Sequence, residues 1–423
     1  MQSQPRVIAY HARSGIGALN VVTGALEADP RTAGMDVVFV KTPAALAAAC
    51  ASAPGPVVVA WSFYSPDFTR MRGELEAARS MGAHALHVAG GVHATAEPRA
   101  TLAAGWDLVA VGEGEATFVE IVAAVARGAS PRVRGTAWLS GKGMGTLESG
   151  GAAPRLPLDA FPACNLRFGL WNALEITRGC IYACSFCQTP FMFKARFRHR
   201  SVDDVRRHVR AMARGGLRYV RFVTPTALSY GTEGETPDLA AVEDLLRTVR
   251  AELPEGGKIY FGTFPSEVRP EHVTPDALAV IARWCDNRSL VIGGQSGSAR
   301  VLDATHRGHD VASIERAVDV AIAHGFRPDV DFLLGLPEED SADRTLSIAL
   351  AERLAARGAR IHAHAFMPLP GTPLAASRPT EIEPDVAAAV ARLESRGAAY
   401  GQWRAQQAVA NELVQLRRTR PPR

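Results

Sequence analysis

Short apolar segments alternate with segments of helical periodicity along most of this 423-residue chain. In the N-terminal part the apolar segments are Val7–Tyr10, Val37–Val40, Val57–Trp61, Ala85–Ala89 and Leu108–Val111. Each is continuous rather than alternating, as in parallel strands that are buried on both faces. The pattern predicts an α/β fold whose N-terminal part is a doubly wound parallel sheet.

A second alternation begins at Ala173, after a hairpin-like stretch and an extended, proline-rich linker. Six strand–helix repeats predict a parallel (βα) barrel, complete or partial. The six predicted strands are Leu174–Thr177, Tyr219–Val223, Ile259–Gly262, Leu290–Gly293, Val330–Leu334 and Arg360–Phe366. The predicted domains are a Rossmann-like sheet over 1–130, a hairpin and linker over 131–170, the barrel over 171–375 and a helical C-terminal extension over 376–423.

Composition narrows the function classes. Hydrophobic residues make up 47% and charged residues 21% of the chain, which excludes global disorder. The formal charge is only +4 and the basic residues are dispersed, so we expect no nucleic-acid partner. No apolar run approaches the roughly 20 residues of a membrane span, and the N-terminus does not resemble a secretory signal. We therefore expect a soluble, cytoplasmic protein without a membrane partner.

Three of the six cysteines lie within eight residues, in Arg178-Gly-Cys180-Ile-Tyr-Ala-Cys184-Ser-Phe-Cys187. The cluster directly follows the first predicted barrel strand, on the side where a barrel carries its active site. Three thiolates around one metal centre leave a coordination position open, which is typical of a catalytic site. A structural zinc site with His199 as fourth ligand is the alternative, and a disulfide is disfavoured in the cytoplasm.

The C-x3-C-x2-C spacing, with Phe186 before the last cysteine, resembles the signature of the radical S-adenosylmethionine (SAM) superfamily. The resemblance implies a [4Fe–4S] cluster on Cys180, Cys184 and Cys187. It also implies that SAM chelates the unique iron and is cleaved to a 5′-deoxyadenosyl radical. An external electron donor such as flavodoxin or ferredoxin, and a small-molecule substrate, are then expected.

Segments after the later barrel strands fit the SAM-binding positions of that superfamily. Thr224-Pro-Thr226 stands where the family usually has a Gly-Gly-Glu-like turn, and it lacks the acidic residue. Pro265–Arg269, Gly293–Ser298 and Asp331–Glu338 follow the next strands in the expected order. The SAM contacts that the resemblance implies are Phe186, Thr224, Thr226, Ser266, Glu267, Arg269, Gln295, Ser296, Leu333 and Gly335.

The N-terminal part resembles the cobalamin-binding domain that precedes many radical SAM domains. Gly90-Gly-Val-His-Ala-Thr95 and, about twenty residues later, Val111-Gly-Glu-Gly-Glu-Ala-Thr117 carry this resemblance. With the run from Gln295 and the His362–Pro373 segment, the whole chain is similar to uncharacterised B12-binding/radical SAM proteins first noted in methanogen genomes. The implied cobalamin contacts are Arg13, Ser14, Ser62, Tyr64, Gly90, Gly91, His93, Gly112, Glu113, Gly114 and Glu115.

The first predicted loop departs from that family. Domains that ligate cobalt carry Asp-x-His-x-x-Gly, whereas this loop reads His11-Ala-Arg-Ser-Gly15. Without a carboxylate to orient it, His11 is a poor metal ligand, so we predict cobalamin without a histidine ligand. The alternative is dinucleotide binding, but Gly15-x-Gly17 has Asn20 at the third glycine position of that fingerprint.

His362 and His364 alternate along the last predicted strand, so they share one face. They are candidates for acid–base catalysis, and a packed histidine pair is an equally good interpretation. The function predicted is cobalamin-dependent methylation of an unactivated carbon of a small molecule or natural-product intermediate. The alternatives are a radical rearrangement or cyclisation and a non-enzymatic cobalamin- or redox-sensing protein. Methylthiotransfer is disfavoured, because the N-terminal part carries only Cys50.

Overall fold

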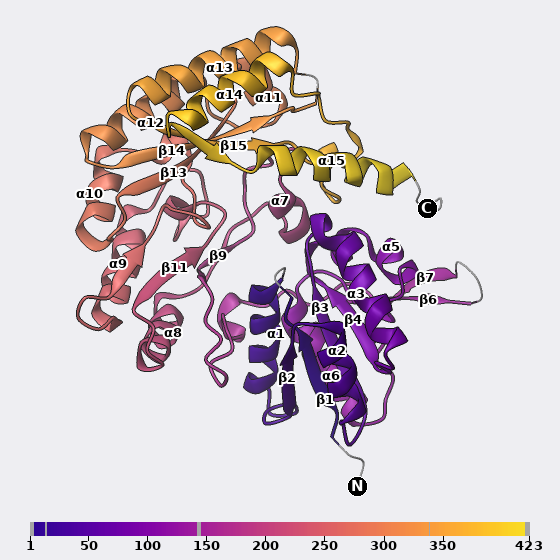
Figure 1. Cartoon of the computed structure of the whole chain (residues 1–423). Helices are drawn as coiled ribbons and strands as arrows, with labels where there is room; N and C mark the ends of the chain where they lie inside the picture. Colours follow the sequence, from indigo (N-terminus) through magenta and orange to yellow (C-terminus); the bar gives the residue numbers. More distant parts are fainter. Residues whose placement is uncertain (1–3, 13–14, 142–144, 338, 419–423) are drawn as a thin grey trace. The chain divides into compact units, whose positions relative to one another are not determined.

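The computed structural model describes residues 4–12, 15–141, 145–337 and 339–418. The chain divides into two compact units, Met1–Asn172 and Ala173–Arg423 (Figure 1). The predicted hairpin and linker therefore cluster with the N-terminal sheet. Within the described residues, no helix is long and apolar enough to cross a membrane.

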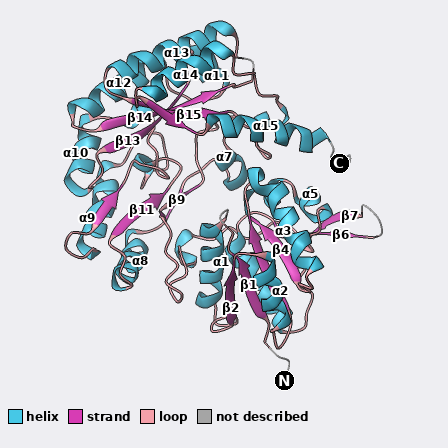
Figure 2. Cartoon of the chain, in the orientation of Figure 1, coloured by secondary structure: helices cyan, strands magenta, loops and turns pink. Residues whose placement is uncertain are grey.

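The N-terminal unit contains one seven-stranded sheet in the order β2-β1-β3-β4-β5-β6-β7, with helices packed around it (Figure 2). The first five strands are parallel and match the predicted segments, while β6 and β7 form an antiparallel hairpin on β5. The strands are β1 (Arg6–Tyr10), β2 (Asp36–Val40), β3 (Val57–Ser62), β4 (Leu86–Gly90), β5 (Leu108–Ala110), β6 (Thr136–Ser140) and β7 (Thr146–Ser149). The helices are α1 (Ile16–Ala28), α2 (Pro43–Ala51), α3 (Phe68–Ser80), α4 (Gly91–Ala96), α5 (Pro98–Ala103) and α6 (Gly114–Ala126).

The strand order reverses between β1 and β3. Open parallel sheets bind ligands at such a switch point, beyond the carboxyl ends of the strands. The prediction of a loop at Gly90–Thr95 is wrong, because Gly91–Ala96 forms the short helix α4. Gly91 adopts φ +85° and begins that helix immediately after β4, which shortens the expected loop to a tight turn.

The C-terminal unit is a partial barrel of parallel strands. The three-stranded sheet β12-β11-β8 meets the four-stranded sheet β13-β14-β15-β16 through a parallel bridge between Val268 and Ile292. All six predicted strands are present. The strands are β8 (Leu174–Glu175), β9 (Thr177–Arg178), β10 (Arg198–His199), β11 (Tyr219–Val223), β12 (Lys258–Tyr260), β13 (Ser289–Gln295), β14 (Arg327–Leu334), β15 (Arg360–Ala365) and β16 (Ala399–Gly401), of which β9 and β10 form a separate antiparallel pair.

Helices separate the barrel strands, and several begin at a side chain that caps the first turn. Ser201, Asp238 and Thr274 each accept a hydrogen bond from the backbone amide three residues on, and Thr274 is followed by proline at the first helical position. Asp340 and Asp343 form a reciprocal capping box. The helices are α7 (Gln188–Phe193), α8 (Val202–Arg214), α9 (Leu239–Glu252), α10 (Pro275–Trp284), α11 (Ala299–Ala304), α12 (Val311–Ala323), α13 (Ser341–Ala356), α14 (Pro384–Ser395) and α15 (Trp403–Arg418).

The C-terminal segment is mostly helical, as predicted, and it also contains one short strand. Ala399–Gly401 forms β16 and pairs in parallel with Ile361–Ala363 of β15. A three-residue strand is too short to give a periodic signal, so only its pairing defines it.

Candidate functional site

The three clustered cysteines converge on one pocket of the C-terminal unit. Gly179 makes the turn into the cluster with φ +81°, and a Cβ there would lie 2.2 Å from the Arg196 carbonyl oxygen, so only glycine fits. Cys180 and Cys184 are buried, and Cys187 packs against them with Phe186. Burial raises the pKa of Cys180 to about 12 and also raises that of Cys187. Metal is therefore needed to hold these thiols as thiolates.

The pocket has a volume of about 390 Å³ and is lined by residues that follow most of the barrel strands. The hydroxyl of Thr226 and the Nε atom of Arg307 are buried there without a hydrogen-bond partner among the described residues. Buried polar atoms of this kind indicate a polar ligand. Of the implied SAM contacts, the pocket lining includes Phe186, Thr224, Thr226, Glu267, Arg269 and Gln295.

Four other implied SAM contacts do not line this pocket. Ser266 is buried and donates to the Thr263 carbonyl oxygen, and Ser296 is hydrogen-bonded to Ser347. Leu333 packs in an apolar cluster, and a Cβ at Gly335 would lie 2.7 Å from the Thr380 carbonyl oxygen. Glu338, at the end of the same motif, lies outside the described residues.

A register shift in β13 accounts for the difference between Gln295 and Ser296. Pairing with β14 shifts between Ile292 and Gln295, and Gln295 adopts φ +77°, a left-handed conformation that is uncommon for a residue other than glycine. Gln295 consequently reaches the pocket lining and Ser296 does not.

Three charged groups complete the pocket. Arg178 donates two hydrogen bonds to Glu175, at 2.9 and 2.6 Å. Arg269 is buried, donates to Glu271 and lies with its guanidinium 3.5 Å from the Tyr182 ring centroid. Burial, with a smaller contribution from the nearby Asp331 carboxylate, raises the pKa of Glu267 to about 7. This carboxyl is thus poised to release its proton to solvent when a cationic ligand binds beside it.

His199 does not act as a fourth ligand for zinc. Its Nδ1 atom lies 3.0 Å from the Thr177 hydroxyl, and its Nε2 atom lies 2.8 Å from the Thr232 carbonyl oxygen, to which it donates. Burial lowers the pKa of His199, which favours the neutral ring. With both nitrogens engaged in hydrogen bonds, His199 has no lone pair available for a metal.

His362 and His364 do share the inner face of β15, and they meet Asp331 of the neighbouring strand. Nδ1 of His362 lies 2.9 Å from Asp331 Oδ1 and 3.1 Å from Nε2 of His364. Burial would raise the pKa of Asp331, but hydrogen bonds to the two imidazoles outweigh burial and hold it below its usual value. Asp331 also lines the pocket of the three cysteines, so it connects the two histidines, which do not line that pocket, to the cavity.

The hydrogen bonds around His364 favour proton handling over metal binding. The three ligand-type atoms lie within 4.8 Å of one another, close enough to hold an ion. However, the Ala365 amide donates to Oε1 of Gln406, which turns the Gln406 amino group toward His364 Nδ1 at 3.2 Å. His364 Nδ1 is then an acceptor, so the ring proton sits on Nε2, the atom that a metal would need.

In the N-terminal unit, the predicted cobalamin contacts gather at the carboxyl edge of the sheet. A Cβ at Gly15 would lie 2.0 Å from the Ser62 carbonyl oxygen, and one at Gly91 would lie 2.8 Å from Ser62 Oγ. The amide of Gly112 donates to Thr95 Oγ1 at 3.0 Å. The segments after β1, β3, β4 and β5 therefore touch one another, and Gly15 lets the backbone after β1 approach the backbone at the end of β3.

Not every predicted cobalamin contact faces outward. Tyr64 is 55% exposed, whereas Glu115 is buried and His93 is only 2% exposed. His93 hydrogen-bonds Ser65 at 2.9 Å and stacks on Phe68. Arg13 and Ser14 lie outside the described residues. The other implied contacts stand at the ends of β3, β4 and β5, and they are Ser62, Gly90, Gly91, Gly112, Glu113 and Gly114.

His11 is held by a chain of side-chain amides. Asn172 donates to the carbonyl oxygens of Gly17 and Ala163, which directs its own carbonyl oxygen toward the Asn20 amino group at 2.9 Å. The Asn20 oxygen therefore faces His11 Nε2 at 2.8 Å and accepts a hydrogen bond from it. In this tautomer Nε2 carries a proton and cannot ligate cobalt, while Nδ1 keeps its lone pair.

Each of the two units matches a protein-family model. Residues 174–351 match the model of the radical SAM superfamily, and residues 12–122 match that of the B12 binding domain. The chain is a radical SAM protein with a B12-binding domain. Its two domains imply a [4Fe–4S] cluster, SAM and cobalamin as cofactors. The pocket fits the first two, because three converging cysteines and buried unpartnered polar atoms line it.

Curated relatives of this radical SAM protein include a tRNA-2-methylthio-N(6)-dimethylallyladenosine synthase of Halorhodospira halophila. It is 30% identical over 229 residues, which are 53% of this chain and 46% of the relative. An uncharacterised protein of Methanopyrus kandleri is 25% identical over 47% of this chain and 38% of its own length. The chain spans about half the length, or less, of these relatives.

Solved structures with the same fold include the radical SAM methyltransferase TsrM from Kitasatospora setae, with cobalamin and a [4Fe–4S] cluster bound. Its TM-score is 0.67 at 16% identity, over 88% of this chain and 77% of TsrM. The cobalamin-dependent radical enzyme OxsB, with aqua-cobalamin bound, has a TM-score of 0.65 at 15% identity, over 93% of this chain and 55% of OxsB. These likenesses establish the fold of the radical SAM protein.

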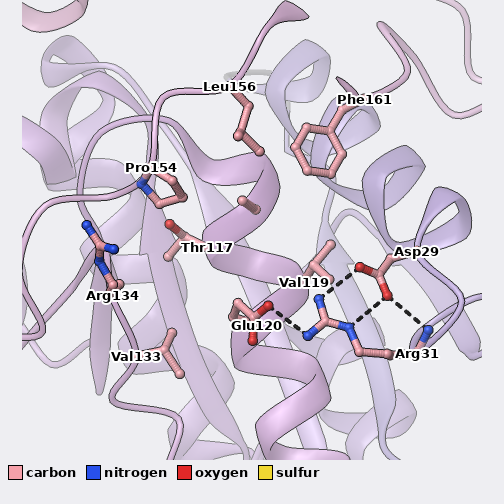
Figure 3. Close-up of a pocket in the computed structure, with 11 residues that line it drawn as sticks. Asp29, Arg31, Thr117, Val119, Glu120, Val133, Arg134, Pro154, Leu156 and Phe161 are labelled. Atoms are coloured by element: carbon pink, nitrogen blue, oxygen red, sulfur yellow. Dashed lines mark hydrogen bonds and ion pairs between the residues drawn. The ribbon is translucent and has the colours of Figure 1, made fainter. Parts of the chain in front are cut away.

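The B12-binding unit contains another cavity, of about 480 Å³, that none of the implied cobalamin contacts lines. It lies between α6 and the 154–161 segment, where Leu156 and Phe161 lie above the helix (Figure 3). At its rim Arg31 bridges Asp29 and Glu120.

Proposed function

We propose that this radical SAM protein is a methyltransferase that uses cobalamin to methylate an unactivated carbon of a small molecule or natural-product intermediate. The observation that carries the proposal is the pocket in which three cysteines meet Glu267 and Arg269, in a chain that also has a B12-binding domain. When bound, SAM and the cluster supply a 5′-deoxyadenosyl radical, and cobalamin supplies the methyl group. An external donor such as flavodoxin or ferredoxin would deliver the electron.

In this proposal the protein binds, orients and shields rather than forming bonds itself. Glu267 accepts the amino group of SAM, which replaces the acidic residue missing from the turn at Thr224. The buried Arg269 provides a positive charge for the SAM carboxylate. His362 and His364 contact Asp331, which lines the pocket, and they are the proposed catalytic side chains of the proton-coupled alternative below rather than of methyl transfer.

The experiment that tests this function uses SAM labelled at its methyl group. Anaerobically reconstituted protein, with cobalamin and a low-potential reductant, is incubated with candidate small molecules, and products are analysed by mass spectrometry. We expect the label on a carbon of the product, together with 5′-deoxyadenosine. Formation of 5′-deoxyadenosine with an unlabelled, isomerised product would overturn methyl transfer.

That second outcome is the runner-up function, a radical rearrangement or cyclisation. The Asp331–His362–His364 group favours it, because a hydrogen-bonded triad that reaches the pocket through Asp331 suits a reaction in which protons move. Carbon methylation by a radical route needs no such proton transfer. Replacing His364 by Gln discriminates the two reactions. It should leave methyl transfer largely intact, but it should slow a proton-coupled rearrangement by about 100-fold or more.

SAM binding should release a proton from Glu267. The pKa of Glu267 is about 7 because its carboxyl is buried, so at pH 6 the free protein holds that proton. The SAM ammonium group stabilises the carboxylate, so affinity should rise with pH, by up to about tenfold per pH unit below pH 7. Calorimetry in two buffers of different ionisation enthalpy measures this release. In Glu267→Gln the release should vanish, and a variant that still releases the proton would refute the assignment.

The cobalt should have no imidazole ligand from His11. Nε2 of His11 donates a hydrogen bond to Asn20, and the Asp-x-His pair of ligating domains is absent. The electron paramagnetic resonance spectrum of Co(II)-loaded protein should be the same for wild type and His11→Ala. Nitrogen superhyperfine splitting that is present in wild type and lost in His11→Ala would demonstrate ligation.

A further inference from the structure

Arg307 is a buried cation that faces the cysteine cluster. Arg307 is only 7% exposed, and its Nη1 atom lies 3.2 Å from Cys184 Sγ. Nη2 donates to the Gly293 carbonyl oxygen at 2.7 Å. A Cβ at Gly293 would lie 3.1 Å from that same nitrogen, so the glycine makes room for the guanidinium. Two contacts therefore fix the orientation of Arg307.

No carboxylate of the described residues forms an ion pair with Arg307, unlike Arg269, which pairs with Glu271. The neighbouring His309 does not balance the charge either. Burial and the Arg307 charge lower the pKa of His309 to about 4, so it is neutral at pH 7. A buried guanidinium without a counter-charge costs several kcal/mol. The anionic group that lies next to the guanidinium is the Cys184 sulfur, once it is a thiolate ligand of the cluster.

We propose that Arg307 is a positioning residue that donates an N–H bond to the Cys184 sulfur and raises the reduction potential of the [4Fe–4S] cluster. Reduction adds one negative charge to the cluster. A fixed cation and an N–H donor at a cysteine sulfur stabilise the reduced state more than the oxidised state. The inference rests on the cluster that the radical SAM domain implies, and it is independent of whether methyl transfer is the reaction.

The experiment is a redox titration of full-length, reconstituted protein, monitored by the electron paramagnetic resonance signal of the reduced cluster. The variants are Arg307→Gln, which removes the charge, and Arg307→Lys, which keeps the charge but loses the two-point contact. Arg316→Gln is the matched control, because Arg316 is exposed on α12 and its side chain donates a hydrogen bond to Ser313, away from the cysteine pocket. Iron and sulfide are counted in each sample.

We expect all variants to bind about four irons, because the three thiolates remain. In Arg307→Gln the equilibrium constant for reduction should fall at least tenfold, a shift of about 59 mV to lower potential. Arg307→Lys should shift by less, and Arg316→Gln should match wild type. A midpoint for Arg307→Gln equal to that of the Arg316→Gln control would overturn the proposal.

Loss of the cluster from an Arg307 variant is a separate outcome, and it is interpreted as follows. Loss of iron from both Arg307 variants, with an unchanged Arg316→Gln control, would assign Arg307 a role in holding the cysteine loop and would also overturn the tuning proposal. If Arg307→Gln loses iron but Arg307→Lys retains it, the potential of the lysine variant decides. An unshifted potential then refutes the proposal, and a lowered one supports it.

Discussion

Replacing Cys184 by alanine should remove the iron–sulfur cluster and reduce SAM cleavage to background. Cys184 is buried in the pocket, between Cys180 and Cys187 in sequence, and accepts the Arg307 contact. With three thiolates the site holds about four irons, and with two it cannot complete the ligand set of a cubane. Iron and sulfide content, visible absorbance and 5′-deoxyadenosine formation under anaerobic conditions measure the effect.

Cys285→Ala is the control for this experiment. Cys285 lies in the same unit, just after α10, outside the pocket lining, and burial raises its thiol pKa, so it is an inert packed residue. It should keep full iron content and cleavage. Wild-type protein that stays colourless after reconstitution with iron and sulfide, and that binds only zinc, would contradict the cluster altogether.

Replacing Gly91 by valine should weaken cobalamin binding by at least about a hundredfold, or roughly 2.7 kcal/mol. Gly91 adopts φ +85°, and its new Cβ would lie 2.8 Å from Ser62 Oγ and 3.3 Å from the Phe63 carbonyl oxygen. The substitution strains the turn and displaces the end of β3, which forms the switch point with β1. Equilibrium dialysis of the full-length variant with cobalamin measures the loss.

The matched control is Gly73→Ala, in the middle of α3, where an added Cβ meets nothing within 4 Å. This variant should bind cobalamin as wild type does, since alanine is also the better helix former. Circular dichroism of both variants verifies folding. Normal binding by folded Gly91→Val would contradict the proposed site. Failure of intact wild-type protein to bind cobalamin under reducing conditions would favour a nucleotide instead.

The sequence was sufficient for the strands and helices because their signals are local. Every predicted strand core is present, since a buried parallel strand appears as one continuous apolar run. The helix at Gly91–Ala96 and the strand at Ala399–Gly401 were not predicted. The first has too few residues for periodicity, and the second is defined only by its pairing with β15.

The site could be predicted only in part, for a different reason. A motif gives the order of residues along the chain, but the face on which a side chain lies depends on local register. The bulge before Gln295 turns Gln295 to the pocket and leaves Ser296 bonded to Ser347. Arg307 was missed as a site residue because 123 positions separate it from Cys184, and no local pattern links a cation to a thiol at that distance.

The incomplete barrel also has a consequence for solubility during folding. Closed barrels have no edges, whereas this one ends at β8 and β16, and an open strand edge is a template for pairing between molecules. The edge of β8 is partly covered, because Arg200 Nε donates to the Glu175 carbonyl oxygen. Both edge strands are very short, at two and three residues. The Gly401 backbone at the end of β16 packs so closely on Ala363 that an added Cβ would lie 2.0 Å from the Ala363 carbonyl oxygen. Short edges thus limit aggregation in a barrel whose wall stays open.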